Sequence, residues 1–136
     1  MAHDVMVLLK SGPMTPRALA DHLHHGMSAD KSLEVTVQRD GNSGADVVVA
    51  KWPDYMMLFL FESSEDIMPE CREISHLFAS HRPDRHEIGL CSNRIRVLGA
   101  DDNDGTHKQR AHVVHRVLMG LKDGVVFNPA EPGLME

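Results

Sequence analysis

The apolar positions of the chain follow two spacings, and each spacing predicts a different element. Val5–Leu9 is a continuous apolar run, which is typical of a central strand buried on both faces. The next stretch has apolar residues at helical spacing. It begins with the capping residue Thr15 ahead of Pro16, and it predicts a helix over Pro16–His25. Leu33–Arg39 alternates apolar and polar side chains, as a half-buried strand does.

The middle of the chain predicts further strands and a second helix. Ala45–Lys51 is rich in valine and follows a glycine-containing turn, so it is expected to return as a hairpin. Tyr55–Glu62 contains the most apolar run of the chain, and we place it centrally in the sheet. A stripe of apolar residues then predicts a helix that ends near His81. Glu87–Cys91 and Arg94–Leu98 predict a second hairpin.

The last third predicts a helix with Val114 and Leu118 on its apolar face, a short strand over Val125–Phe127, and an irregular tail over 128–136. The expected order is β-α-β-β-β-α-β-β-α-β. This order predicts an α+β fold with a mixed, mostly antiparallel sheet and helices packed on one face. Because no low-complexity linker divides the chain, residues 1–136 are expected to form a single compact domain.

Charge and composition exclude several classes of protein. The 136 residues include 20 acidic and 14 basic side chains, with a formal charge of -6. Residues 1–70 hold 11 acidic and 5 basic side chains, whereas 71–136 hold 9 of each. An acidic chain with 4% aromatic residues is a poor candidate for binding nucleic acid.

Membrane and secretory signals are missing from the pattern as well. The longest apolar run is far too short to cross a membrane, and the first residues lack the form of a signal peptide. Two cysteines do not make a disulfide framework. We therefore expect a cytoplasmic protein with reduced thiols and no membrane partner.

The ten histidines raise the question of a metal site. His22 with His25, and His112 with His115, are each three residues apart on a predicted helix, so each pair shares a face and could supply two ligands. Neither pair has a third ligand at a recognised spacing, and arginines beside the second pair repel a cation. We expect solvated helix surfaces, with no metal and no cofactor.

Sequence patterns for catalysis are equally weak. Cys91 and His86 are five apart on a predicted strand and would point to opposite faces. The chain has no nucleophile elbow, no phosphate-binding glycine loop and no dinucleotide fingerprint. We therefore expect that the protein is not an enzyme.

Charged loops and turn aromatics are the best candidates for contacting a partner. The expected partner-binding residues are Glu65, Asp66, Asp101, Asp102, Asp104, Trp52 and Tyr55. The carboxylates would steer a basic partner, and tryptophan and tyrosine are frequent interface hot spots. The alternative for the two aromatics is that they cap the core. Two arginines, Arg94 and Arg96, share one face of a strand; they either form an outer hairpin face or anchor an acidic group of a partner.

These observations favour a non-enzymatic protein-binding module. A bacterial immunity protein, which neutralises a partner toxin by covering its active surface, is a compact acidic example of that class. The alternative is a histidine-rich regulatory domain that binds a metal or a small molecule. A third reading is a homodimer in which the apolar strand Tyr55–Phe61 is buried at the interface.

Overall fold

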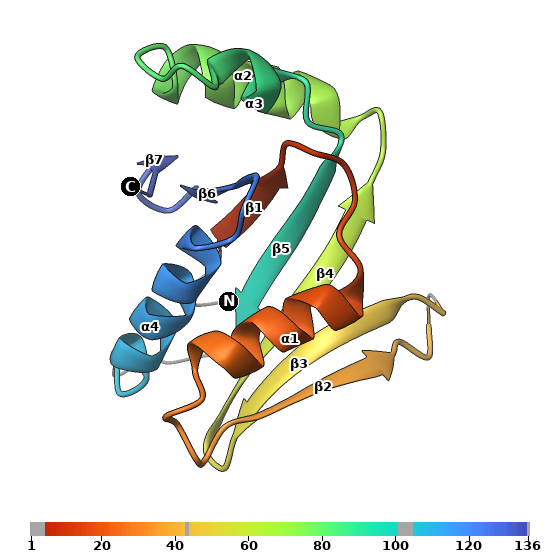
Figure 1. Ribbon diagram of the computed structural model, residues 1–136, viewed down its shortest axis with the longest axis vertical. Helices are drawn as coiled ribbons and strands as arrows, with labels where there is room; N and C mark the ends of the chain where they lie inside the picture. Colours follow the sequence, from red (N-terminus) through yellow and green to blue (C-terminus); the bar gives the residue numbers. More distant parts are fainter. Residues whose placement is uncertain (1–4, 43, 101–104, 136) are drawn as a thin grey trace.

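The computed structural model describes residues 5–42, 44–100 and 105–135, and these form one seven-stranded sheet with four helices. In chain order the elements are β1 (Val5–Leu9), α1 (Pro16–Gly26), β2 (Glu34–Arg39), β3 (Asp46–Trp52), β4 (Tyr55–Ser63), α2 (Ile67–Phe78), α3 (Arg85–Gly89), β5 (Asn93–Gly99), α4 (Lys108–Met119), β6 (Gly124–Asn128) and β7 (Gly133–Leu134). The α+β class predicted from the sequence is confirmed (Figure 1).

The strand order across the sheet is β2-β3-β4-β5-β1-β6-β7. Each of the six neighbouring pairs in the described chain is antiparallel, which agrees with the mostly antiparallel sheet expected from the sequence but leaves no parallel pair among the described strands. The first strand of the chain, β1, lies between β5 and β6. As predicted, β1 is central and β2 and β3 form a hairpin.

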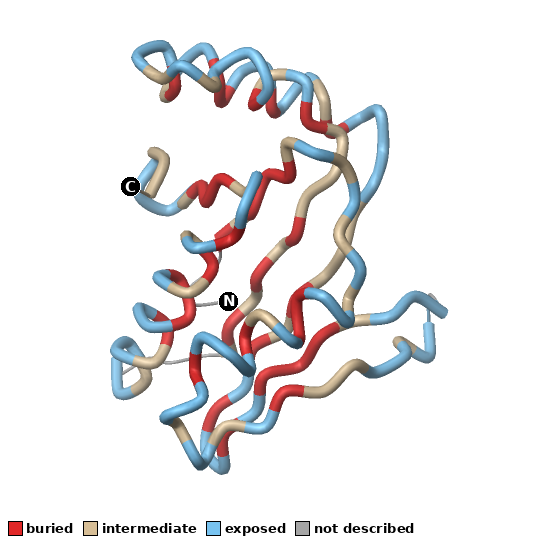
Figure 2. Tube along the Cα trace, viewed as in Figure 1, coloured by how far each residue is buried: buried red, intermediate tan, exposed pale blue. Residues whose placement is uncertain are grey.

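Helices α1 and α4 cover one face of the sheet. Their buried residues, such as Leu23 and Leu118, belong to one cluster with alternate residues of the strands, including Phe59 and Val97. Helix α1 begins as the sequence predicts, because the Thr15 hydroxyl accepts a 3.1 Å hydrogen bond from the backbone N–H three residues later. Buried residues recur along β1, β3 and β5 and on α1 and α4 (Figure 2).

Helices α2 and α3 pack on the opposite face, over the β1–β6 end of the sheet. Their apolar residues cluster with Leu8, Val125 and Phe127, which alternate with the residues that face α1 and α4. The expectation that all helices pack on one face is therefore wrong in this respect. The hydrophobic pattern of a helix shows that it has a buried side, but not which face of the sheet receives it.

The segment 87–91 is not the strand expected from its sequence. Most of it belongs to α3 and the turn that follows, with Ile88 and Cys91 buried against α2 and Leu90 53% exposed. A spacing of three between the buried residues fits a helical turn, and β5 pairs with β4 instead of with this segment. The tail expected to be irregular contains β7, in which Leu134 pairs with Phe127.

Candidate functional site

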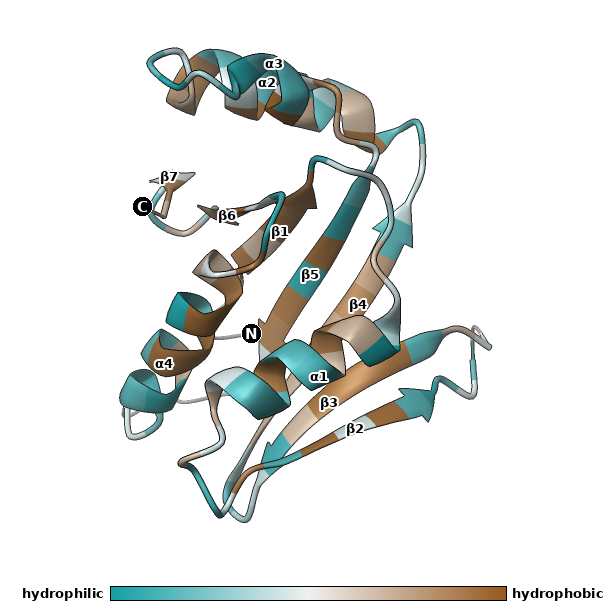
Figure 3. Ribbon diagram, in the orientation of Figure 1, coloured by the Kyte–Doolittle hydropathy of each residue, from teal (hydrophilic) through white to brown (hydrophobic). Residues whose placement is uncertain are grey.

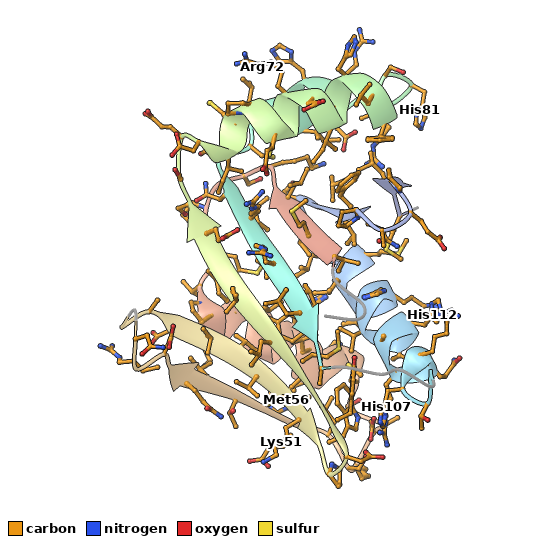
Figure 4. The ribbon with its side chains drawn as sticks, turned by 180° about the vertical axis from the view of Figure 1, so that it is seen from behind. Lys51, Met56, Arg72, His81, His107 and His112 are labelled. Carbon is orange, nitrogen blue, oxygen red and sulfur yellow. The ribbon has the colours of Figure 1, made fainter. Side chains whose placement is uncertain are left out.

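One face of the sheet is left without a helix over β2, β3 and β4. Seen from behind, these strands lie in front of α1 (Figure 4). We call the central outward side chains of β2–β5 the open face: Thr36, Val49, Met56, Leu58, Leu60, Arg96 and Leu98. Polar residues of β2 and β3, namely Glu34, Gln38 and Lys51, lie on the same side of the sheet around it. None of the helices in the described chain has the length and hydrophobicity needed to span a membrane.

The centre of the open face is apolar. Leu58 on β4 lies between Val49 on β3 and Leu98 on β5 in the antiparallel register. Met56, two residues before Leu58 on the same face, is 40% exposed (Figure 4). Since the other side of β4 is already buried under the helices, this strand is apolar on both faces although a helix covers only one.

Arg96 is the cation at the β5 side of this surface, and Lys51 on β3 is a second one, opposite Met56. In the register of β5, Arg96 lies between Leu60 on β4 and Met6 on β1, both apolar. Its guanidinium forms no hydrogen bond or ion pair with any residue in the described ranges. The alternation of polar and apolar residues along β5 is visible in Figure 3. The sequence expectation that Arg94 and Arg96 share one face of a strand is confirmed.

A groove of about 550 Å³ borders the open face where α2 passes over β1, β5 and β6. Arg94 and Arg96 both line it, together with the apolar side chains of Leu77, Phe78 and Phe127. The two arginines differ in their partners. Arg94 donates to Glu62 at 2.7 Å and also to Glu70, so its charge is neutralised. Arg96 forms no such pair among the described residues, although Glu70 and Glu73 also line this groove.

The aromatics predicted as partner anchors are buried in this structure. Trp52 is 1% exposed and Tyr55 is 5% exposed. The Arg110 guanidinium lies 5.7 Å from the centre of the Trp52 ring, and Tyr55 stacks on His107 with ring centroids 4.5 Å apart. These positions match the alternative that the two aromatics cap the core, because neither ring offers surface to a partner.

The predicted acidic residues do not gather with these aromatics. Glu65 and Asp66 are exposed in the turn before α2, whereas Trp52 and Tyr55 lie at the opposite end of β4. The Asp66 backbone N–H donates to the Ser64 hydroxyl at 3.1 Å, which fixes the turn and leaves the Asp66 carboxylate to solvent. The other three predicted carboxylates, Asp101, Asp102 and Asp104, lie outside the described residues.

Two histidines of α1 have backbone hydrogen-bond partners. His22 Nε2 donates a 2.7 Å hydrogen bond to the carbonyl of Val117, which ties α1 to α4, and His24 Nε2 donates to the carbonyl of Val35 at 3.2 Å. His115 is buried, with its ring centroid 6.5 Å from that of His112. Among the described residues, no group of three or more histidine, cysteine, aspartate or glutamate side chains is placed to hold a metal ion.

The open face could have been suspected from one feature of the sequence. Tyr55–Phe61 is apolar at every position, which requires two apolar environments around the strand. The sequence could not show that α1 and α4 cover only one face of this strand and leave the other without a helix. Comparison of the chain with protein-family models, with curated proteins and with solved structures finds no match.

Proposed function

We propose that the chain is a non-enzymatic protein-binding module whose open face takes a partner with apolar side chains around a carboxylate. The observation that carries this proposal is β4, a strand apolar on both faces and covered by helices on one. A second protein that packs on Leu58 and its neighbours would remove their apolar surface from water. The central residues of the open face are leucine, valine, methionine and arginine, which supply contact area and charge but no nucleophile.

Charge complementarity defines the chemistry of the partner. Arg96 forms no ion pair within the described residues and sits among apolar side chains, where arginine is a frequent interface hot spot. Its planar guanidinium binds a carboxylate with two parallel hydrogen bonds, and this pairing strengthens as water is excluded. The partner should therefore present an aspartate, a glutamate or a chain terminus to Arg96, surrounded by apolar residues.

The narrower expectation of an immunity protein fits the same surface. A toxin neutralised by this chain would dock on the open face and lose access to its own active surface. Genes for a toxin and its inhibitor are expected to be neighbours, so the products of the adjacent genes are the first partners to test. The exposed carboxylates Glu65 and Asp66 would then contribute at the edge of the contact, through steering more than through affinity.

The test is co-expression of the chain with each neighbouring gene product, followed by gel filtration and a measured Kd for any complex. Arg96→Glu should weaken the complex at least about 30-fold, which corresponds to roughly 2 kcal/mol. Met56→Asp places a charge at an exposed position of the same face and should also weaken it. Arg116→Glu, an exposed arginine on α4, is the matched control and should leave the Kd unchanged.

Two kinds of result would overturn the proposal, one from the binding measurements and one from the isolated chain. One is that no neighbouring product binds, or that Arg116→Glu weakens the complex as much as Arg96→Glu. The other is that light scattering finds the isolated chain to be a dimer that Arg96→Glu dissociates. The open face would then be a surface for self-association, and not for a different protein.

A further inference from the structure

A second pocket lies on the other side of α2, between α2 and α3. It has a volume of about 380 Å³. Its lining residues come from both helices and the segment between and after them: Arg72, Ser75, His76, Ser80, Arg85, His86, Gly89 and Leu90. Figure 4 shows Arg72 on the outer side of α2, pointing away from the sheet. Neither this pocket nor its residues belong to the open face.

The polar side chains that line this pocket are hydrogen-bond donors, and several of them are potential cations. It contains two guanidinium groups, two imidazoles and two hydroxyls, and it contains no carboxylate. This occurs on a chain with a formal charge of -6, so the pocket does not reflect a generally basic surface. Clustered cationic groups repel one another, and a bound anion would relieve that repulsion.

The acidic residues nearby are directed elsewhere. Glu73 lines the groove on the opposite side of α2. The carboxylate of Asp84 accepts hydrogen bonds from Arg82 and Lys10, each at 2.8 Å. Glu87 is exposed on α3 and does not line the pocket. The fold therefore separates the charges of a segment whose sequence mixes arginine with acidic residues.

The walls of the pocket are held at a defined spacing. Ser75 is buried, and its hydroxyl donates a 2.5 Å hydrogen bond to the carbonyl of Arg85, which joins α2 to α3. Arg85 in turn donates from Nη1 to the carbonyl of Ser80 at 3.1 Å. Arg72, His76 and His86 form no hydrogen bond or ion pair within the part of the chain that the structure describes, so their N–H groups are available to a ligand.

We propose that this pocket binds the phosphate group of a small phosphorylated ligand. Phosphate oxygens accept charge-assisted hydrogen bonds from guanidinium and imidazole N–H groups, and the planar guanidinium of Arg72 can bind two oxygens at once. The volume holds a phosphate together with a small organic group. Leu90, which is 53% exposed, supplies an apolar wall for that group.

The test is an NMR titration of the full chain with inorganic phosphate and with pyrophosphate, at constant ionic strength set with chloride. Saturable shifts are expected at the amides of Ser80, Gly89 and Leu90. Arg72→Gln should raise the Kd at least about fivefold, because it removes a charged donor pair. Arg72→Lys keeps only the charge, so its Kd should lie between those of the wild type and Arg72→Gln. Arg72 is exposed, so its replacement should leave the melting temperature unchanged.

Arg116→Gln is the control, since it removes an exposed arginine from a helix outside the pocket. Shifts that do not saturate, or that spread over the surface, would overturn the proposal, as would an equal loss of affinity in Arg116→Gln. Arg96→Glu should not change phosphate binding, so the failure of either proposal can be recognised independently of the other.

Discussion

The indole Nε1 of Trp52 donates a 2.8 Å hydrogen bond to the carboxylate of Asp30, and this contact joins the β3–β4 hairpin to the loop after α1. The same carboxylate accepts from the backbone N–H and the hydroxyl of Ser32, at 3.1 and 2.8 Å. The hydrogen bond from Trp52, followed by that from Ser32, lowers the pKa of Asp30 below its ordinary value of 3.8. Trp52, which the sequence predicts at a partner interface, thus has a structural role.

The first prediction follows from this contact. Asp30→Ala leaves the buried indole N–H without its acceptor, so the free energy of unfolding should fall by about 1 to 3 kcal/mol. Because folding lowers the pKa of Asp30, its contribution is present above the pKa of the unfolded chain and is lost as the pH falls through the folded value. The wild type should therefore lose stability on acidification below about pH 4 more steeply than Asp30→Ala.

Urea unfolding at a series of pH values measures both effects. Asp21→Ala, an exposed carboxylate on α1, is the control and should leave the stability and its pH dependence close to those of the wild type. Equal losses in Asp21→Ala and Asp30→Ala would show that the Trp52 contact does not contribute.

The second prediction concerns Asp84, which joins the end of β1 to the segment before α3. Hydrogen bonds from Arg82, and then from Lys10, hold the pKa of its carboxyl far below the ordinary value. Both Lys10 and Asp84 have side chains that are 20% exposed, so solvent screens the pair only in part. Asp84→Asn should lower the free energy of unfolding by about 1 to 2 kcal/mol at neutral pH.

A double-mutant cycle with Lys10→Met separates the Lys10–Asp84 interaction from the effect of each change alone. The coupling energy should be about 0.5 to 1.5 kcal/mol by urea unfolding. A coupling near zero would mean that Asp84 is held by Arg82 alone.

The third prediction tests the crossing of α1 and α4. An added Cβ at Gly26 would lie 2.6 Å from Cγ1 of Val117, which is closer than two carbon atoms approach. Gly26→Ala should therefore reduce stability by about 1 to 3 kcal/mol, although alanine favours a helix more than glycine does. Val117→Ala removes the obstructing methyl groups.

Thermal unfolding of Gly26→Ala, Val117→Ala and the double variant measures this relationship. The double variant should be more stable than the sum of the single effects predicts, because the second change opens space for the first. Strict additivity would show that the two helices adjust their separation without cost.

The fourth prediction concerns Cys71 and Cys91, which are 0% and 3% exposed. The hydrogen bond between the two thiols, together with burial, raises the pKa of Cys91, and its Sγ also donates to the carbonyl of Glu87 at 3.4 Å. The same hydrogen bond lowers the pKa of Cys71, so the protection expected for both thiols comes from their burial. Both cysteines should react with a thiol-specific disulfide reagent only as fast as the α2–α3 region opens.

Two thiols per chain should react at once in denaturant and slowly in native buffer. Ser28→Cys places a third thiol at an exposed position after α1 and provides the reference for full access. Fast reaction of the wild type in native buffer would contradict the buried arrangement of the two native cysteines.

Much of the fold could be predicted from local pattern. The Thr15-Pro16 start of α1, the alternation of β2 and the placement of Arg94 and Arg96 on one strand face are set by residues close in sequence. The strand expected over residues 87–91 is wrong because a segment of five residues that includes a few apolar side chains fits a strand and a helical turn equally well. The contact of Ile88 with α2 decides between them, and it depends on the tertiary fold.

The candidate site was less predictable, because it depends on what covers each face. The burial of Trp52 requires Asp30 from one loop and Arg110 from α4, which are 22 and 58 positions away along the chain. The sequence predicts that Arg96 shares a strand face with Arg94. The isolation of Arg96 among apolar neighbours became visible only when the register placed Leu60 and Met6 beside it.

The position of β1 in the sheet has a consequence for how the chain folds during synthesis. Among the described strands β1 is made before the others, yet its neighbours on both sides, β5 and β6, begin at Asn93 and Gly124. The β2–β3–β4 strands can pair as soon as they are made, whereas the most buried strand must wait for most of the chain. A ribosome-bound chain would therefore hold β1 as an unpaired apolar segment until β5 and β6 have been made. That segment is where we expect a chaperone to bind the nascent protein.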